Sequence, residues 1–414
     1  MAILATGTGL ARVIGVVSIP ILTRLYSPED FGVMAVFVAL VAILTPLLTL
    51  RYVLALPLPR HDGLAMNLLF LSASLLVVMG TVLGLGLALF AAPLLSLLSM
   101  EVLAPWWWLI VIALIGSGLY ELLSLWATRR REYRAIACTQ ITQSVVGSAV
   151  KIGLGYLGVG PIGLLVGSVF SKTSGIGYLS RKFFSEFDKN FKRLRKSRLR
   201  CVAIRYISFP GYRLPSQFML VVSQSAPMFL IAYYYDSYTV GQFALAFAIV
   251  KSPTSLISGS ISEAFYAEIA RISTTPKTLF RVAKSVFKKV SIIGLPIAVG
   301  LIVLSPPAFP RIFGTEWQLA GVLAAILAIG IIPNFVGQTI IQALTVTRRN
   351  HIFFLFNTSR VFVVIASLMI PAIAGLTIIW VVISFTLALA IQRLVQVFLI
   401  FRWLKKDLRT DILA

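Results

Sequence analysis

Seven basic side chains lie inside stretches of apolar sequence that otherwise carry little charge. They are Arg12, Lys151, Lys172, Arg213, Lys251, Arg360 and Arg393. Two acids, Glu121 and Glu263, lie in or near such stretches, and Asp236 lies at an edge. Since these acids are too few to neutralise the cations, a positive interior is costly unless an anion enters it. Guanidinium groups donate forked hydrogen bonds that suit phosphate, so the predicted chemistry is anion binding.

The cations differ in their depth within the apolar stretches. Arg12 and Lys251 lie near the middle of theirs, beyond easy reach of water, and we predict that they face a cavity; an ion pair with a neighbouring helix is the alternative. Arg51 and Arg213 lie closer to an end, where snorkelling explains them almost as well. The preferred interpretation of four other cations is that they bind lipid headgroups or pair between helices; they are Lys151, Lys172, Arg360 and Arg393. Pro253 predicts a kink beside Lys251.

The elements that position these residues are membrane spans. The 414 residues are 58% hydrophobic and 12% charged, whereas soluble domains average about 25% charged. A span needs about 20 apolar residues, and we expect twelve of them, with no separate catalytic domain. The expected ranges are 1–23, 31–50, 64–92, 102–126, 135–157, 159–180, 207–233, 238–264, 290–310, 318–345, 352–374 and 377–401. The predicted fold is an all-α integral membrane protein.

The distribution of charge orients these spans. Of the 37 Lys and Arg residues, 28 fall in the even-numbered connections and the C-terminal tail, and only Arg24 and Arg311 fall in the odd ones. Positive loops stay inside, so both termini are predicted to be cytoplasmic. The richest stretch, RKFFSEFDKNFKRLRKSRLR, is interpreted as a solvated loop near anionic lipid headgroups and not as a nucleic-acid site.

The basic stretch divides the spans into six and six. We therefore expect an N-terminal bundle over 1–180, a basic cytoplasmic linker over 181–206, and a C-terminal bundle with a short tail over 207–414. A faint repeat supports this division: when Gly32 is aligned with Gly241, GVMAVFVALVAILTPL and GQFALAFAIVKSPTSL share six of sixteen positions. Parallel repeats of this kind are typical of two-bundle transporters, so transport is the leading class.

Other chemistry finds little support. The chain has no P-loop motif, no paired carboxylates and no Ser, His and Asp set, so we expect neither an enzyme nor an unaided ATP-driven pump. Two cysteines and two histidines, far apart, predict neither a disulfide framework nor a metal site, and no cofactor is expected. For ion coupling, Glu121 and Glu263 are the available carboxylates, with a structural pair to a basic residue as the favoured alternative.

The order of several motifs resembles the Wzx-type oligosaccharide flippases of the polysaccharide transporter family, in the multidrug/oligosaccharidyl-lipid/polysaccharide exporter superfamily. The motifs are ILTRLYSPEDFGVMAVF, TLRYVLALPLPRHDGLAMNLLFLS, LWATRRREYRAIACTQITQSVVGSAVKIGLGYLG, FPGYRLPSQFMLVVSQSAPMFLIAYYYDSYTVGQFALAFAIVKSPTSLISGSISEAFY and IFGTEWQLAG. The resemblance implies movement of undecaprenyl-pyrophosphate-linked sugar units across the bacterial inner membrane for O-antigen, capsule or exopolysaccharide assembly. It implies as partners a lipid-linked anionic oligosaccharide, membrane lipids, a polysaccharide polymerase and a chain-length regulator, and no nucleic acid.

The same resemblance implies where the substrate binds. In that fold, spans one, two, seven and eight line a central cavity between two six-helix bundles, which supports Arg12, Arg51, Arg213 and Lys251 as substrate-binding residues. Arg24 would meet the substrate in an outward-facing state, and the bundles would move by alternating access. Members of the family often have an acid where this chain has Val53, which puts a carboxylate role there in doubt.

Three rival functions stay open. A lipid II-type flippase usually has two further spans, and a multidrug/cation antiporter would prefer an acidic cavity. From another class, a membrane-embedded polysaccharide polymerase or ligase would need a sizeable outer loop, whereas the odd connections here are short. An assembly scaffold is a further alternative.

Overall fold

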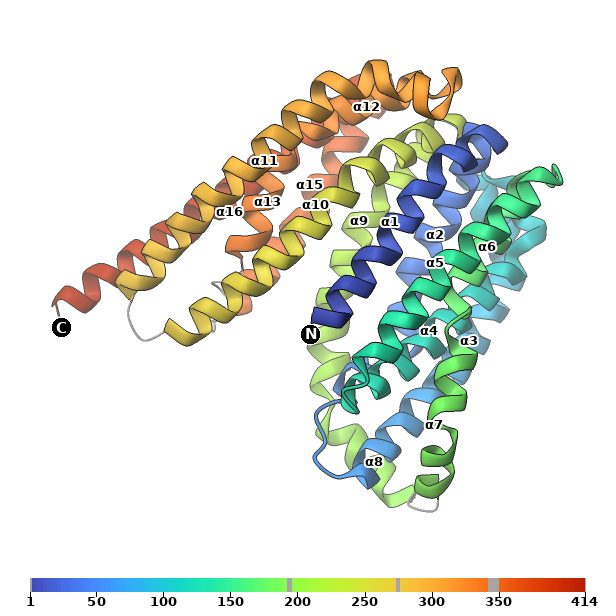
Figure 1. The fold of residues 1–414 in the computed structure, drawn as a ribbon, viewed down its shortest axis with the longest axis vertical. Coiled ribbons are helices and arrows are strands. Elements are labelled where there is room, and N and C mark those ends of the chain that lie inside the picture. Colours follow the sequence, from blue (N-terminus) through green and yellow to red (C-terminus); the bar gives the residue numbers. More distant parts are fainter. Residues whose placement is uncertain (1, 192–195, 273–275, 342–349, 414) are drawn as a thin grey trace. The chain divides into compact units, whose positions relative to one another are not determined.

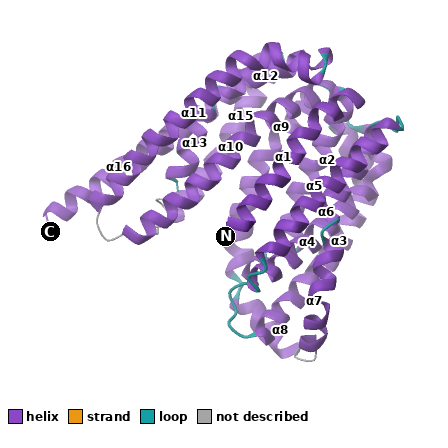
Figure 2. Ribbon diagram, viewed as in Figure 1, coloured by secondary structure: helices purple, strands orange, loops and turns teal. Residues whose placement is uncertain are grey.

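The computed structural model describes residues 2–191, 196–272, 276–341 and 350–413. The regular secondary structure of these residues is helical throughout (Figures 1 and 2). The helices are α1 Ala2–Leu25, α2 Pro28–Leu48, α3 Asp62–Leu97, α4 Trp107–Arg129, α5 Tyr133–Tyr156, α6 Pro161–Thr173, α7 Ile176–Phe191, α8 Lys196–Arg205, α9 Leu214–Tyr234, α10 Ser237–Ile272, α11 Pro276–Phe313, α12 Gln318–Ala328, α13 Ile331–Ile340, α15 Asn350–Ile373 and α16 Ile378–Leu413. Short helical turns cover Tyr52–Ala55, Glu101–Trp106, Phe209–Arg213 and Thr315–Trp317.

The apolar helices confirm the predicted fold class. Within the described residues, nine segments are long and apolar enough to cross a membrane, and α12 with α13, bent by 48°, counts as a tenth. The helices α5 and α10 have 24 and 36 residues and are also long enough to span a membrane, and α5 is the more polar of the two. With these two, the helical bodies correspond to the twelve predicted spans.

The basic stretch after residue 180 differs from the expected loop. Described residues on both sides of its gap are helical, in α7 and α8. Leu179, Phe183 and Phe187 recur every four residues and so share one face of α7. Leu179 and Phe183 are buried, and the Phe187 ring lies 5.3 Å from that of Trp126. The basic residues hide this apolar stripe when the sequence is judged by its charge alone.

The chain divides into two compact units, Met1–Gly241 and Gln242–Ala414. In the first unit, α1 packs along α5 with small and hydroxylated residues at the contact. Thr8 donates to Gln140 over 2.6 Å, and Ser144 donates to the carbonyl oxygen of Ala11 over 2.6 Å. The Tyr26 hydroxyl donates to a carbonyl of α5, and burial, aided by the nearby Asp30 carboxylate, raises the pKa of Tyr26 to about 12. Tyr26 therefore remains a donor at physiological pH.

The two glycines that align in the internal repeat pack against each other. Each is the fifth residue of its helix, Gly32 in α2 and Gly241 in α10. A Cβ atom on Gly32 would overlap the carbonyl oxygen of Ser237, and one on Gly241 would overlap that of Pro28. The repeat alignment therefore pairs two residues whose backbones touch in the folded chain.

This close approach makes a side chain at position 32 costly. We expect Gly32→Ala to destabilise the protein by about 1–3 kcal/mol, because backbone atoms must move to admit the methyl group. The matched control is Gly153→Ala in α5, where a Cβ would meet nothing within 4 Å and alanine is the better helix former. Thermal unfolding in detergent should show a lower Tm for the first variant and an unchanged or higher Tm for the second. Equal Tm values would contradict the packing described.

In the second unit, α11 packs on α12, and α16 packs on both α13 and α15. Gln242 joins α10 to this group: its side-chain amide donates to the carbonyl of Glu316 over 2.6 Å and accepts from the backbone of Ala320 over 2.8 Å. Phe243 packs edge-on against Phe385, with ring centroids 6.2 Å apart. A buried amide with both ends bonded fixes the position of α10 in this unit.

Candidate functional site

Arg51 is the buried member of the predicted cation set. It follows α2 with a φ of 61°, in the left-handed region that side chains seldom adopt. Its guanidinium group donates to Glu121 of α4 over 2.6 Å, and the two side chains are 7% and 23% exposed. The Nε atom of Arg51 and the second carboxylate oxygen of Glu121 have no partner in the described structure. The structure thus brings together a predicted substrate residue and a predicted coupling residue.

The other three arginines of the predicted set lie exposed in the first unit. Arg12 lies on α1, and Arg24 lies in the last turn of the same helix. Arg213 ends the turn Phe209–Arg213, with its guanidinium carbon 6.0 Å from the centre of the Phe209 ring. Exposure in a membrane protein means access to lipid or to water, and a charged group is much less costly in contact with water.

Lys251 lies in the second unit. It is exposed on α10, which continues through Pro253, and its ammonium nitrogen lies 5.3 Å above the centre of the Phe247 ring. A cation at this distance from an aromatic face is stabilised when water is scarce. Glu263, the second predicted coupling residue, belongs to the same helix, but its side chain lies outside the described residues.

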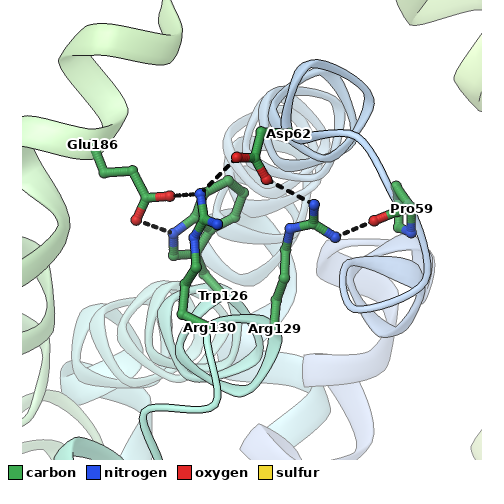
Figure 3. Close-up of polar contacts among 6 residues, drawn as sticks. All are labelled: Pro59, Asp62, Trp126, Arg129, Arg130 and Glu186. Carbon is green, nitrogen blue, oxygen red and sulfur yellow. Dashed lines mark hydrogen bonds and ion pairs between the residues drawn. The ribbon is translucent and has the colours of Figure 1, made fainter.

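A charged network at one end of the first unit is absent from the sequence predictions. Arg129 donates to Asp62 over 2.8 Å, and Arg130 donates to Asp62 over 3.0 Å and also to Glu186 (Figure 3). Arg129 donates further to the carbonyl oxygen of Pro59. The network joins the start of α3, the end of α4 and the middle of α7. Because it links three helices through charge-assisted hydrogen bonds, it braces this end of the unit.

Trp126 contacts the charged network with its aromatic ring and its indole nitrogen. Its indole nitrogen donates to Glu186 over 3.4 Å, and the Arg130 guanidinium lies 5.6 Å from its ring centre (Figure 3). Lys182 and Glu132 add an ion pair of 2.7 Å between α7 and the turn before α5. One signal in the sequence could have indicated the network, because Asp62, Glu132 and Glu186 lie in connections that are otherwise basic.

Metal chemistry has no group of ligands to support it in the described part of the chain. No group of three or more His, Cys, Asp or Glu residues there could hold a metal ion. Cys138 and Cys201 are both free and exposed. The described side chains that match the predicted site are exposed cations and one buried ion pair, that of Arg51 with Glu121.

Known proteins resemble this chain in sequence. The family described as "Polysaccharide biosynthesis protein" matches residues 21–322. The succinoglycan biosynthesis transport protein ExoT of Rhizobium meliloti (strain 1021) is 24% identical over 320 residues, which are 76% of this chain. The chain spans 62% of the length of that relative.

Solved structures share the fold. The lipid II flippase MurJ, in an inward closed conformation, superposes with a TM-score of 0.68 at 16% identity, over 96% of this chain and 87% of that one. An inward-facing multidrug resistance transporter of the MATE family gives 0.62 at 14% identity, over 99% and 95%. The MATE multidrug transporter DinF-BH gives 0.60 at 17% identity, over 97% and 94%. At these identities the likeness shows the fold alone.

Proposed function

The chain belongs to the family of polysaccharide biosynthesis proteins, and we propose that it flips lipid-linked sugar units across the bacterial inner membrane. The proposed substrate is an undecaprenyl-pyrophosphate-linked oligosaccharide, and the product feeds assembly of a surface polysaccharide such as O-antigen, capsule or exopolysaccharide. A polysaccharide polymerase and a chain-length regulator are the proposed partner proteins. The protein carries its substrate and breaks no bond.

The observation that carries this proposal is the family match, which extends over residues 21–322. Both units of the molecule fall partly within that range. The net formal charge of +23 and the cations on membrane helices add the chemistry, because a pyrophosphate needs positive partners in a medium of low dielectric constant. A cationic drug would be repelled by the same groups, which disfavours an antiporter of cationic drugs.

In the proposed mechanism, the two halves alternate between inward and outward access while the anionic headgroup binds to cations. Arg12 and Lys251 bind the pyrophosphate, and Arg213 and Arg24 meet it near the two entrances. Arg51 contributes to the site as part of its ion pair with Glu121. The pair is neutral overall, and one oxygen of the Glu121 carboxylate has no partner. The polyprenyl tail stays in lipid, so only the polar headgroup meets the cations.

Complementation tests this proposal. The gene is expressed in strains that lack their own repeat-unit flippase, each making a different surface polysaccharide, and surface polysaccharide is measured. The proposal predicts restored polysaccharide in at least one strain whose sugar unit is anionic. Restored drug resistance in a pump-deficient strain without any restored polysaccharide would instead establish an exporter of drugs.

Topology is a separate expectation. Reporter fusions after Gly160, between α5 and α6, and after Gly314, following α11, should report the outer side of the membrane. A fusion after Arg131, between α4 and α5, should report the inner side, because basic connections stay cytoplasmic. An inner signal at either glycine would disprove the predicted orientation.

A further inference from the structure

The hairpin of α15 and α16 holds two arginines that the proposed function does not use. Arg360 lies on α15 and Arg393 on α16, next to Ser359 and Gln392, whose side chains are joined by a hydrogen bond of 3.1 Å. Within the described residues, neither arginine forms an ion pair with an acid. Arg393 packs against α13, where a Cβ atom on Gly337 would lie 2.8 Å from its Cδ. A nearby anion would stabilise two like charges held inside one unit.

The unsatisfied donors at this pair show what kind of anion. The Nε atoms of Arg360 and Arg393 are buried and have no hydrogen-bond partner. A terminal nitrogen of Arg393 donates to the side-chain oxygen of Gln396 over 2.9 Å, and that residue is 1% exposed with its amide nitrogen unpartnered. The Nε side of a guanidinium group is the edge that pairs with two oxygens of a phosphate. The open donors therefore suit an oxyanion better than a halide.

An apolar groove lies along the same hairpin. The groove has a volume of about 570 Å³ and lies between α15 and α16. Its lining residues include Val363, Ser367, Ile370 and Trp380. The first three follow Arg360 by 3, 7 and 10 residues, so they share its face of α15. Ile370 and Trp380 are 67% and 58% exposed, which leaves the groove open to the surrounding membrane. A phosphate at Arg360 would thus have an apolar channel directly beside it.

We propose that the α15–α16 hairpin binds an anionic phospholipid of the membrane, with its phosphate at Arg360 and Arg393 and an acyl chain in the groove. The basic end of the hairpin, where Arg402 and Lys405 lie on α16, is on the arginine side of the groove. A lipid placed in this way keeps its headgroup toward the charged end of the helices and its chain toward the apolar end. A free phosphate would satisfy the arginines but would leave the groove unexplained.

The corresponding helices of the first unit carry a contrasting pair. Lys151 on α5 and Lys172 on α6 occupy the fifth and sixth helices of the chain, as Arg360 and Arg393 occupy the last two. These two helices pack against each other. Ammonium groups lack the forked donor geometry of guanidinium. The phospholipid site is therefore assigned to the guanidinium pair of the second unit.

Native mass spectrometry of the purified full-length protein tests this inference. The detergent-solubilised protein is incubated with phosphatidylglycerol, phosphatidylethanolamine or inorganic phosphate at constant ionic strength. The mass spectrum then gives the number of ligand molecules bound to each protein. Arg360→Gln and Arg393→Gln remove the charges, Ala366→Phe fills the groove, and Arg134→Gln removes an exposed arginine from α5 as the control. Arg393→Lys keeps the charge without the fork, in case the glutamine variant does not fold.

We expect the wild type and Arg134→Gln to retain one phosphatidylglycerol that withstands collisional activation. Arg360→Gln, Arg393→Gln and Ala366→Phe should each weaken its binding by roughly tenfold or more, and Arg393→Lys should weaken it less. Equal retention in the arginine variants and the wild type would overturn the assignment. Binding of inorganic phosphate without retention of lipid would overturn it as well. The readout needs no transport, so it is independent of the proposed function.

Discussion

Alanine at position 12 or 251 is expected to abolish restoration of surface polysaccharide in a flippase-deficient strain. Arg12 lies on α1 and Lys251 on α10, each exposed on a membrane helix, where a cation is costly to keep. If each binds the pyrophosphate, its loss removes a charge-assisted contact worth about 1.5–3 kcal/mol, which weakens binding of the substrate by about ten- to a hundredfold. Surface polysaccharide is measured at matched expression.

A conservative variant separates two roles for Arg12. Arg12→Lys keeps the charge but loses the forked donors. If it retains activity while both alanine variants lose it, the cations act through their field; if it also fails, directed contacts to pyrophosphate are required. Arg134→Ala, which removes an exposed arginine at the start of α5, is the matched control and should be fully active. Full activity of both alanine variants would mean that Arg12 and Lys251 are not substrate residues.

Breaking the Arg51–Glu121 pair is expected to give the largest loss of stability. Glu121→Gln leaves a guanidinium group that is 7% exposed without its counter-charge, and removal of one partner of a buried pair costs about 3–5 kcal/mol. Arg51→Met should cost a similar amount. The double variant should recover most of the loss, since an uncharged pair of similar volume replaces the charges. Thermal unfolding of the four proteins in detergent completes the double-mutant cycle.

The same variants decide whether Glu121 carries protons. If the double variant folds and transports with an unchanged pH profile, the carboxylate serves structure and not coupling. A double variant that folds but loses the pH dependence of transport would place a proton at Glu121. Additive losses in the cycle would show instead that the pair does not stabilise the fold.

Much of the architecture follows from the sequence because hydrophobic length and charge placement are local signals. The expected spans 31–50 and 352–374 correspond to α2 and α15 to within three residues at each end. The repeat alignment also pairs Gly32 with Gly241, the two residues whose backbones are in contact. Local signals fail where an element has mixed character, as in α7, whose apolar face is hidden among basic residues.

The candidate site was less accessible because it depends on which helices are neighbours. Arg51 and Glu121 are 70 positions apart, and their pairing requires α4 to lie beside α2. Likewise, nothing local in the sequence joins Asp62 to Arg129 and Arg130. Composition predicted an excess of buried cations, but their partners came only from the folded chain. The roles of Arg12, Arg24, Arg213 and Lys251 in substrate binding remain predictions.

A flipping measurement with purified protein tests most directly whether the protein moves lipid-linked sugar units across a membrane. Proteoliposomes are prepared with a fluorescent undecaprenyl-pyrophosphate oligosaccharide in both leaflets, and a membrane-impermeant quencher is added outside. Wild-type protein should make the inner-leaflet pool accessible to the quencher, whereas Arg12→Ala and Lys251→Ala should leave it protected, as in protein-free liposomes. The inner-leaflet pool could instead stay protected with correctly folded wild-type protein, for anionic and neutral sugar units alike. That result would contradict the proposal that the protein flips lipid-linked sugar units.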